Sequence, residues 1–137
     1  MDANITGSLK AKGVKPSYLR TRILEYMLRY RNHPTVDMIY QALAPEIPTL
    51  SRTTVYNTVN LFMEKGLVQR IGIDDQEMRY DADTEVHAHF RCERCGTILD
   101  LPVDPYLTPV KYPEGLVVSE IQYYLRGLCE KCSLEKN

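Results

Sequence analysis

Two cysteine pairs constrain this chain more than any other feature. They are Cys92-x-x-Cys95 and Cys129-x-x-Cys132, and they hold all four cysteines of the sequence. Two thiolates separated by two residues can reach one tetrahedral ion from a single tight turn, and a second such pair completes the shell of a structural zinc site. Gly96 follows the first pair and permits the positive φ that a metal-binding turn often needs. The spacing therefore predicts one structural Zn²⁺ ion held by four cysteines.

Two disulfides or a redox-active pair are the alternatives for these cysteines. Disulfides need an oxidising compartment, and residues 1–9 lack the apolar run of a signal peptide. A redox site uses one such pair, so a matched second pair argues against it. We therefore expect a cytoplasmic protein with reduced thiols.

Length and charge place further limits on the fold and its partners. The 137 residues are 44% hydrophobic, enough for one domain or two small ones, and no apolar run approaches the roughly 18 residues of a membrane span. The net charge is −1, yet Ser8 to Arg31 contains seven basic residues and one acid, whereas Glu85 to the end contains six basic and eight acidic residues. This asymmetry indicates contact with a polyanion at one end, although a solvated helix face would look similar.

Three helices are predicted in the first half of the chain. Apolar residues at spacings of three and four indicate helices over Ser17–Arg31, Val36–Leu43 and Arg52–Lys65. Ser51 can cap the third helix at its start, and Gly66 stands where a C-terminal glycine is expected.

The third predicted helix has two dissimilar faces. Val55, Val59 and Phe62 form an apolar stripe. The opposite side is polar but almost uncharged, with Thr53, Asn57 and Asn60 on it and Tyr56 on its flank. Such side chains can hydrogen-bond base edges.

Residues 67–73 and 78–80, with a turn at 74–76, then predict a β-hairpin. Three helices and a hairpin indicate a winged helix-turn-helix that reads DNA, and a helical protein–protein module is the alternative.

The second half of the chain predicts a small sheet with metal ligands. His87 and His89 alternate along a predicted strand and point the same way, as two imidazoles binding a divalent ion would. We expect a strand at 97–100, a short helix around 104–110 and another strand over 116–125. An apolar sheet face with few residues to cover it predicts a dimer, which would double the reading helix and require a palindromic site.

Four segments carry a resemblance to a known family. They are residues 51–59 (SRTTVYNTV), 66–68 (GLV), 87–96 (HAHFRCERCG) and 127–132 (GLCEKC). In this combination the chain resembles the ferric uptake regulator family of bacterial metal-dependent repressors. The resemblance implies an α+β fold, with a winged helix-turn-helix DNA-binding domain over 1–84, a hinge at about 81–86, and a small α/β zinc-containing dimerisation domain over 85–137.

The resemblance also implies site residues and partners. The regulatory metal, Fe²⁺ or Mn²⁺, is expected on His33, Asp81, His87, His89 and Asp100. The DNA-binding residues are expected to be Arg20, Arg52, Thr53, Tyr56 and Asn57, with Lys12 and Lys15 at the phosphates. The implied partner is an A/T-rich inverted repeat of double-stranded DNA, bound by a homodimer.

The ligand set favours one branch of the family. Both carboxylate ligands are aspartates, as in the peroxide-sensing branch, whereas the iron-sensing branch tends to use glutamates. Val86 and Ala88 stand where the iron branch often places a second site, and no cysteine remains for the regulatory site that the zinc-sensing branch usually builds. The resemblance thus implies peroxide sensing through Fe²⁺-dependent oxidation of His33 or His87.

Three other functions remain as alternatives. An iron- or manganese-responsive repressor would have the same ligands without sensing peroxide. A metal hydrolase needs an open metal position and a nearby general base, and five candidate ligands leave little room for them. A zinc-stabilised interaction module would bind no DNA. We therefore expect a regulator rather than an enzyme.

Overall fold

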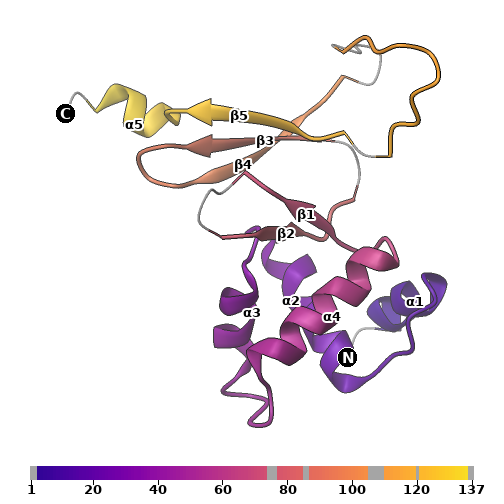
Figure 1. Cartoon of the computed structure of the whole chain (residues 1–137). Helices are drawn as coiled ribbons and strands as arrows, with labels where there is room; N and C mark the ends of the chain where they lie inside the picture. The colour runs from indigo at the N-terminus through magenta and orange to yellow at the C-terminus, as the bar shows by residue number, and fades with distance from the viewer. Residues whose placement is uncertain (1–2, 74–76, 85–86, 105–109, 120, 136–137) are drawn as a thin grey trace. The chain divides into compact units, whose positions relative to one another are not determined.

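The computed structural model describes residues 3–73, 77–84, 87–104, 110–119 and 121–135 (Figure 1). The chain forms two compact units, Met1–Thr84 and Glu85–Asn137. Helices fill the first unit and a small sheet forms the second, which confirms the predicted α+β class. Within the described part of the chain, no helix is both long and apolar enough to cross a bilayer.

The described part of the first unit contains four helices, and three of them begin at a capping residue. They are α1 (Ala3–Ala11), α2 (Tyr18–Tyr30), α3 (Val36–Leu43) and α4 (Arg52–Glu64). The side chains of Ser17, Thr35 and Ser51 accept hydrogen bonds from backbone N–H groups in the first turns of α2, α3 and α4. These caps satisfy donors that have no partner inside the helix, so each start is fixed locally. The predicted helices therefore correspond to α2, α3 and α4.

Helix α1 was not predicted. Its sequence, ANITGSLKA, has Gly7 at its centre, which lowers helix propensity. Ile5 and Leu9, one turn apart, are nevertheless buried against the core of the unit. Tertiary packing thus stabilises a helix that its own sequence favours only weakly.

The core of the first unit lies between α2, α3 and α4. Val55, Val59 and Phe62 are fully buried, as the apolar stripe of the third predicted helix requires. Each such side chain stabilises the fold by roughly 2 kcal/mol. Gly66 ends the helix with φ of +78°, and the backbone N–H of Leu67 returns to the carbonyl of Phe62. The stripe turns the polar side of α4 toward solvent.

A two-stranded hairpin follows the helices. Strands β1 (Gln69–Ile71) and β2 (Arg79–Asp81) pair antiparallel, with Arg70 opposite Tyr80. The predicted turn at 74–76 lies outside the described residues. The backbone N–H of Tyr80 donates to the carbonyl of Pro34, 3.0 Å away, so β2 is attached to the segment between α2 and α3.

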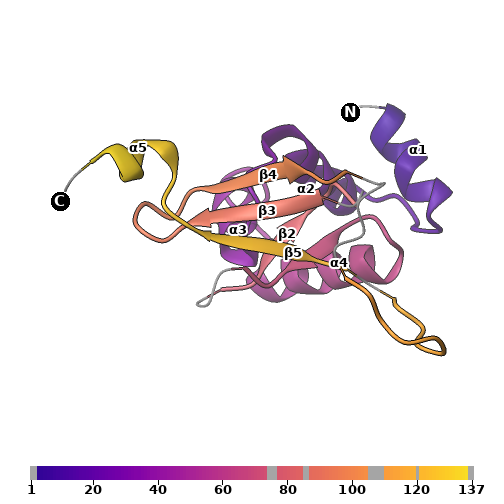
Figure 2. The same cartoon turned by 90° about the horizontal axis from the view of Figure 1, so that it is seen from above.

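The second unit is built on a three-stranded sheet in the order β4-β3-β5 (Figure 2). Strand β3 (His87–Cys92) pairs antiparallel with β4 (Ile98–Pro102) and parallel with β5 (Tyr123–Gly127), and helix α5 (Glu130–Leu134) follows. The sequence predicted neither the parallel pairing nor α5.

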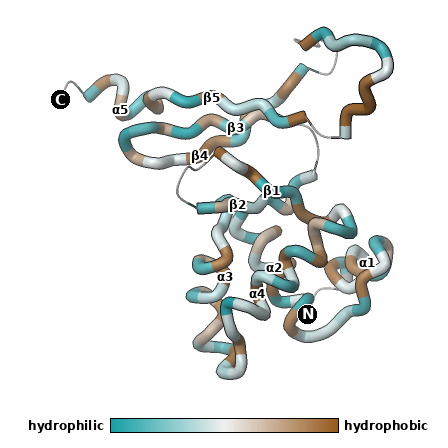
Figure 3. The backbone as a smooth tube through the Cα atoms, viewed as in Figure 1, coloured by the Kyte–Doolittle hydropathy of each residue, from teal (hydrophilic) through white to brown (hydrophobic). Residues whose placement is uncertain are grey.

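The last strand of this unit is shorter than the sequence predicts. The strand expected over 116–125 was wrong in extent, because β5 begins only at Tyr123. The preceding loop holds an apolar stretch, visible in Figure 3, in which Leu116, Val117 and Val118 are exposed and not in a strand. Strand β5 pairs with β3 from Tyr123, opposite Ala88, to Gly127, opposite Cys92. The helix expected around 104–110 falls largely on 105–109, outside the described residues.

The two faces of the sheet differ in chemistry. His89 stands opposite Asp100 on one neighbour strand and opposite Tyr124 on the other. The next residue of β3, Phe90, stands between Leu99 and Leu125. Because successive side chains of a strand point to opposite faces, one face carries metal-binding groups and the other an apolar row.

Candidate metal centres and nucleic-acid interface

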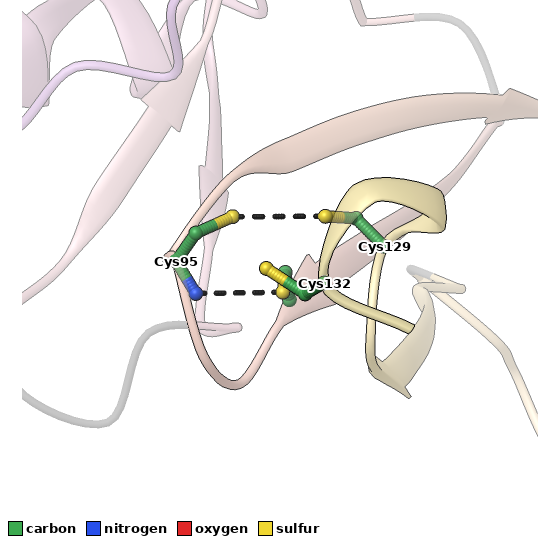
Figure 4. Close-up of side chains that lie close together, drawn as sticks. Cys95, Cys129 and Cys132 are labelled. Atoms are coloured by element: carbon green, nitrogen blue, oxygen red, sulfur yellow. Dashed lines mark hydrogen bonds between the residues drawn. The ribbon is translucent and has the colours of Figure 1, made fainter. Parts of the chain in front are cut away.

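The structure brings all four cysteines of the second unit together. Cys92 ends β3 and Cys95 lies in the turn after it, while Cys129 caps α5 and Cys132 lies on its inner side. One Sγ atom from each cysteine lies within 4.8 Å of the others, and all four are free thiols. Figure 4 shows the sulfur atoms of Cys95 and Cys129 directed toward one another, 3.8 Å apart. Tetrahedral Zn–S bonds of about 2.3 Å place sulfur atoms about 3.8 Å apart, so the donors and their spacing fit zinc.

The surroundings of these cysteines change the pKa of their thiols in opposite directions. The N–H of Cys95 donates to the Sγ of Cys92, and backbone N–H groups, that of Cys95 first, lower the pKa of Cys92 to about 5. Burial and the neighbouring thiols raise the pKa of Cys132 to about 12. Four crowded sulfur atoms therefore do not all ionise by themselves. A dication provides the charge that lets all four bind as thiolates.

A buried histidine–aspartate pair forms a candidate half-site in the first unit. The Nε2 of His33 lies 3.7 Å from Oδ2 of Asp81, and each residue is only 6% exposed. The N–H of Asp83 donates to the other carboxylate oxygen of Asp81, which fixes that side chain. His33 itself has φ of +51°, a conformation that costs energy in a residue with a Cβ, and Nη1 of Arg79 donates to its carbonyl at 3.2 Å. Strand β2 thus holds this histidine in position.

The second unit contains another half-site on its sheet. Nε2 of His87 and Nε2 of His89 lie 3.4 and 3.3 Å from the same oxygen, Oδ1 of Asp100. The two imidazole rings are 4.3 Å apart, and both histidine side chains are almost buried while the carboxylate is 40% exposed. Two nitrogen donors and one oxygen donor converge here on one face of the sheet. Such a set suits a divalent transition metal.

The polar side of α4 faces solvent in the first unit. The predicted contact residues Arg52, Thr53, Tyr56 and Asn57 are all exposed. Lys12 and Lys15 are exposed as well, whereas Arg20 is half-buried and its Nη1 donates to the Lys15 carbonyl, 2.8 Å away. Arg20 therefore orders the basic loop before α2 in the free protein.

Sequence reasoning missed the partners of Arg52. Its Nε lies 2.6 Å from Oδ1 of Asp37, and its Cζ lies 4.3 Å from the ring centroid of Tyr40. Both partners are on α3. A contact between residues on two helices depends on how the helices cross, and no local pattern could have indicated it.

Comparison with known proteins agrees with this arrangement. The ferric uptake regulator family model matches residues 11–109. The chain is 38% identical over 134 residues to the peroxide operon regulator of Bacillus subtilis, which covers 95% of this chain and 92% of that protein. The solved structure of PerR from Streptococcus pyogenes is 30% identical, with a TM-score of 0.54 and coverage of 96% and 94%. The Helicobacter pylori regulator Fur shares the fold, with a TM-score of 0.69 at 20% identity over 98% and 92% of the two chains. With this match, its two-unit fold and its cysteine cluster, the chain belongs to the ferric uptake regulator family.

Proposed function

We propose that this protein is a metal-dependent DNA-binding repressor of the peroxide-responsive kind. The observation that carries the proposal is the buried pair of His33 and Asp81, an imidazole and a carboxylate held side by side in the unit that also presents α4. A buried carboxylate is costly unless cations or hydrogen-bond donors stabilise its charge. A divalent cation is the compensation that the family membership suggests.

One regulatory ion bound by both half-sites would have three nitrogen and two oxygen donors. His33 and Asp81 come from the first unit, and His87, His89 and Asp100 from the second. This donor set suits Fe²⁺ or Mn²⁺ better than a thiolate-rich site would. An ion that needs ligands from both units favours the conformers that bring those ligands together. Metal binding would thereby shift the population toward the arrangement that binds DNA.

The surface of α4 supports DNA as the partner. Exposed Thr53, Tyr56 and Asn57 offer neutral polar groups for base edges, and exposed Lys12 and Lys15 offer charge for phosphates. We further propose that the apolar row around Phe90 joins two copies of the chain. A homodimer carries two copies of α4, and its target is a double-stranded inverted repeat, A/T-rich as the family resemblance implies.

Peroxide sensing would use the ligand histidines themselves. His33 and His87, with the other proposed ligands, would hold Fe²⁺, which would supply the redox chemistry that activates hydrogen peroxide. The net change is the insertion of one oxygen atom into His33 or His87, with water as the other product. An oxidised ring binds metal poorly, so the metal-bound conformers lose population and DNA is released. The names of the relatives, a peroxide operon regulator and a PerR, support a response to peroxide.

The first experiment is DNA binding by the zinc-loaded protein with and without Mn²⁺. The probes are an A/T-rich inverted-repeat duplex and a shuffled duplex of equal length and composition. We expect retention of the repeat only with Mn²⁺. The His89→Ala variant should keep its zinc and lose this response, while Tyr124→Phe, altered near the same imidazole without loss of a proposed ligand, should respond normally. A Mn²⁺ response that survives His89→Ala would remove this histidine from the site.

The second experiment tests oxidation. After Fe²⁺ and peroxide, we expect a mass gain of about 16 Da in the peptide that holds His33 or His87. The Mn²⁺-loaded protein is the control and should gain nothing. Metal-gated DNA binding without the mass gain would assign the protein to the iron- or manganese-responsive repressors instead.

A further inference from the structure

The first residue of the DNA-facing helix is held by two residues of the preceding helix. Arg52 begins α4, and Asp37 and Tyr40 belong to α3. The Nε of Arg52 lies 2.6 Å from Oδ1 of Asp37, and the guanidinium carbon lies 4.3 Å from the Tyr40 ring centroid. The hydrogen bond to Asp37 orients the Nε edge of the guanidinium, and the Tyr40 ring restricts the tilt of its plane.

From this geometry we infer that Asp37 is a specificity-determining residue, which positions Arg52 for base readout. The inference rests on the proposed DNA-binding function. A mobile arginine at a helix start is attracted to any phosphate, whatever the sequence. A carboxylate on its Nε reduces that attraction and directs the remaining N–H donors of the planar guanidinium. A base edge with two acceptors in the major groove matches such a pair of donors.

The negative charge of Asp37 also weakens binding to unrelated DNA sequences. Discrimination is a difference between two affinities, and it grows when the competitor is weakened. On an unrelated sequence Arg52 would make only phosphate contacts, and the nearby carboxylate would repel the same phosphates. On the correct sequence the base contact compensates for that repulsion.

A purely structural role does not account for this pair. Both side chains are about half exposed, at 55% for Arg52 and 51% for Asp37, and exposed ion pairs contribute little to stability. The buried Ile39 of α3 and Val55 of α4 belong to the same hydrophobic core cluster. Loss of the carboxylate should therefore leave the fold intact.

The test measures binding by the full-length, zinc- and Mn²⁺-loaded protein to the inverted-repeat and shuffled duplexes at several salt concentrations. Asp37→Asn should raise affinity for the shuffled duplex, steepen its salt dependence, and lower the ratio of the two affinities roughly tenfold, the scale of one base contact. Asp37→Glu keeps the charge and should restore most of the ratio. Glu64→Gln removes an exposed acid at the other end of α4 and should leave the ratio unchanged.

Several outcomes would overturn the inference. An unchanged ratio in Asp37→Asn would do so, as would equal changes in Asp37→Asn and Glu64→Gln, which would indicate bulk charge alone. A lower thermal midpoint with equal losses on both duplexes would assign the pair to structure. If the wild-type protein fails to distinguish the duplexes, the proposed function fails together with the inference. If the wild-type protein distinguishes them and Asp37→Asn distinguishes them with the same ratio of affinities, only the inference fails.

Discussion

At the scale of single residues, the four cysteines show how uncharged neighbours change the pKa of a thiol. Backbone N–H groups lower the pKa of Cys92, while burial raises that of Cys132, so the four sulfur atoms differ before any ion binds. Arg94 adds a mechanical connection, because its Nη1 donates to the carbonyls of Cys132 and Glu135 and joins α5 to the first cysteine turn. The pairing of β3 with β5 and the hydrogen bond from the N–H of Glu93 to the carbonyl of Gly127, 2.7 Å away, also join the two turns.

We predict that Cys95→Ser abolishes zinc binding and unfolds the second unit. The sheet has three strands among the described residues, and structural zinc contributes on the order of 10 kcal/mol to such small units. Zinc content by mass spectrometry and hydrogen exchange of the β3 amides would measure the two effects. Ser133→Ala is the control, since it changes a neighbouring side chain on α5 and keeps all four thiols. A folded, zinc-free second unit in Cys95→Ser would contradict the four-cysteine site.

A surface cluster in the first unit predicts a pH dependence of stability. Arg22 donates through Nε and Nη2 to both oxygens of Glu46, at 2.6 and 2.9 Å, and the Tyr18 hydroxyl donates to the same carboxylate. These hydrogen bonds, that of Arg22 first, lower the pKa of Glu46 from 4.5 to about 2. Because the folded pKa is lower, the contribution to stability is complete above about pH 4.5 and is lost as the pH falls through about 2.

Glu46→Gln should therefore lower the urea midpoint of unfolding at pH 7, and the difference from wild type should narrow as the pH falls below about 4.5. Added salt should narrow it as well, since the group is exposed. Circular dichroism during urea titration at several pH values measures this. A difference that stays constant with pH would show that the carboxylate charge has no part in it.

At the scale of elements, strand β2 links the hairpin to a proposed metal ligand. Arg79 and Tyr80 both bind backbone of the segment between α2 and α3, and Asp81 directly follows them. The left-handed conformation of His33 thus has external support. A residue that orients a ligand commonly affects metal affinity nearly as much as the ligand does.

Arg79→Gln should weaken Mn²⁺ binding roughly tenfold while both units stay folded. Direct Mn²⁺ titration by electron paramagnetic resonance measures the affinity without DNA. Arg70→Gln, on the partner strand β1, removes the same charge from the hairpin and should leave the affinity unchanged. Equal affinities in wild type and Arg79→Gln would mean that His33 keeps its position without this hydrogen bond.

The elements also show where sequence reasoning succeeds. Helices α2, α3 and α4 were predictable because Ser17, Thr35 and Ser51 mark their starts and because the apolar spacing is clear. Helix α1 was not predictable, since Gly7 weakens its pattern and only packing reveals the role of Ile5 and Leu9. The parallel register of β5 with β3 joins residues more than 30 positions apart, and no local pattern indicates it.

In the candidate sites too, features set by local sequence were predictable, and contacts between distant elements were not. The close approach of the four cysteine sulfur atoms follows from local spacing together with the fold, and the sequence indicated it. The support from Arg79 and the positioning of Arg52 by Asp37 arise from crossings between elements distant in the sequence. Such contacts leave no periodicity, and they become visible only in three dimensions.

At the scale of the whole molecule, the two faces of the small sheet in the second unit have different proposed roles. The face that carries His89 and Asp100 serves the proposed metal, and the opposite face carries Leu99, Phe90 and Leu125 in one row. Leu99 and Leu125 are 44% and 47% exposed. Apolar groups that stay accessible next to one another are characteristic of an interaction surface. A second copy of the chain is the occupant that an inverted-repeat target requires.

Leu125→Glu should therefore convert the protein to a monomer, because the new carboxylate would lose its hydration within an apolar interface. Sedimentation velocity measures the assembly state, and the zinc content shows whether the unit stays folded. Leu134→Glu is the matched control, since Leu134 is 76% exposed on α5 and outside the row. The monomer should lose affinity for the inverted repeat while its binding to a single half-site persists, since each copy keeps its own α4. A Leu125→Glu protein that remains dimeric would place the interface elsewhere and leave the apolar row without its proposed partner.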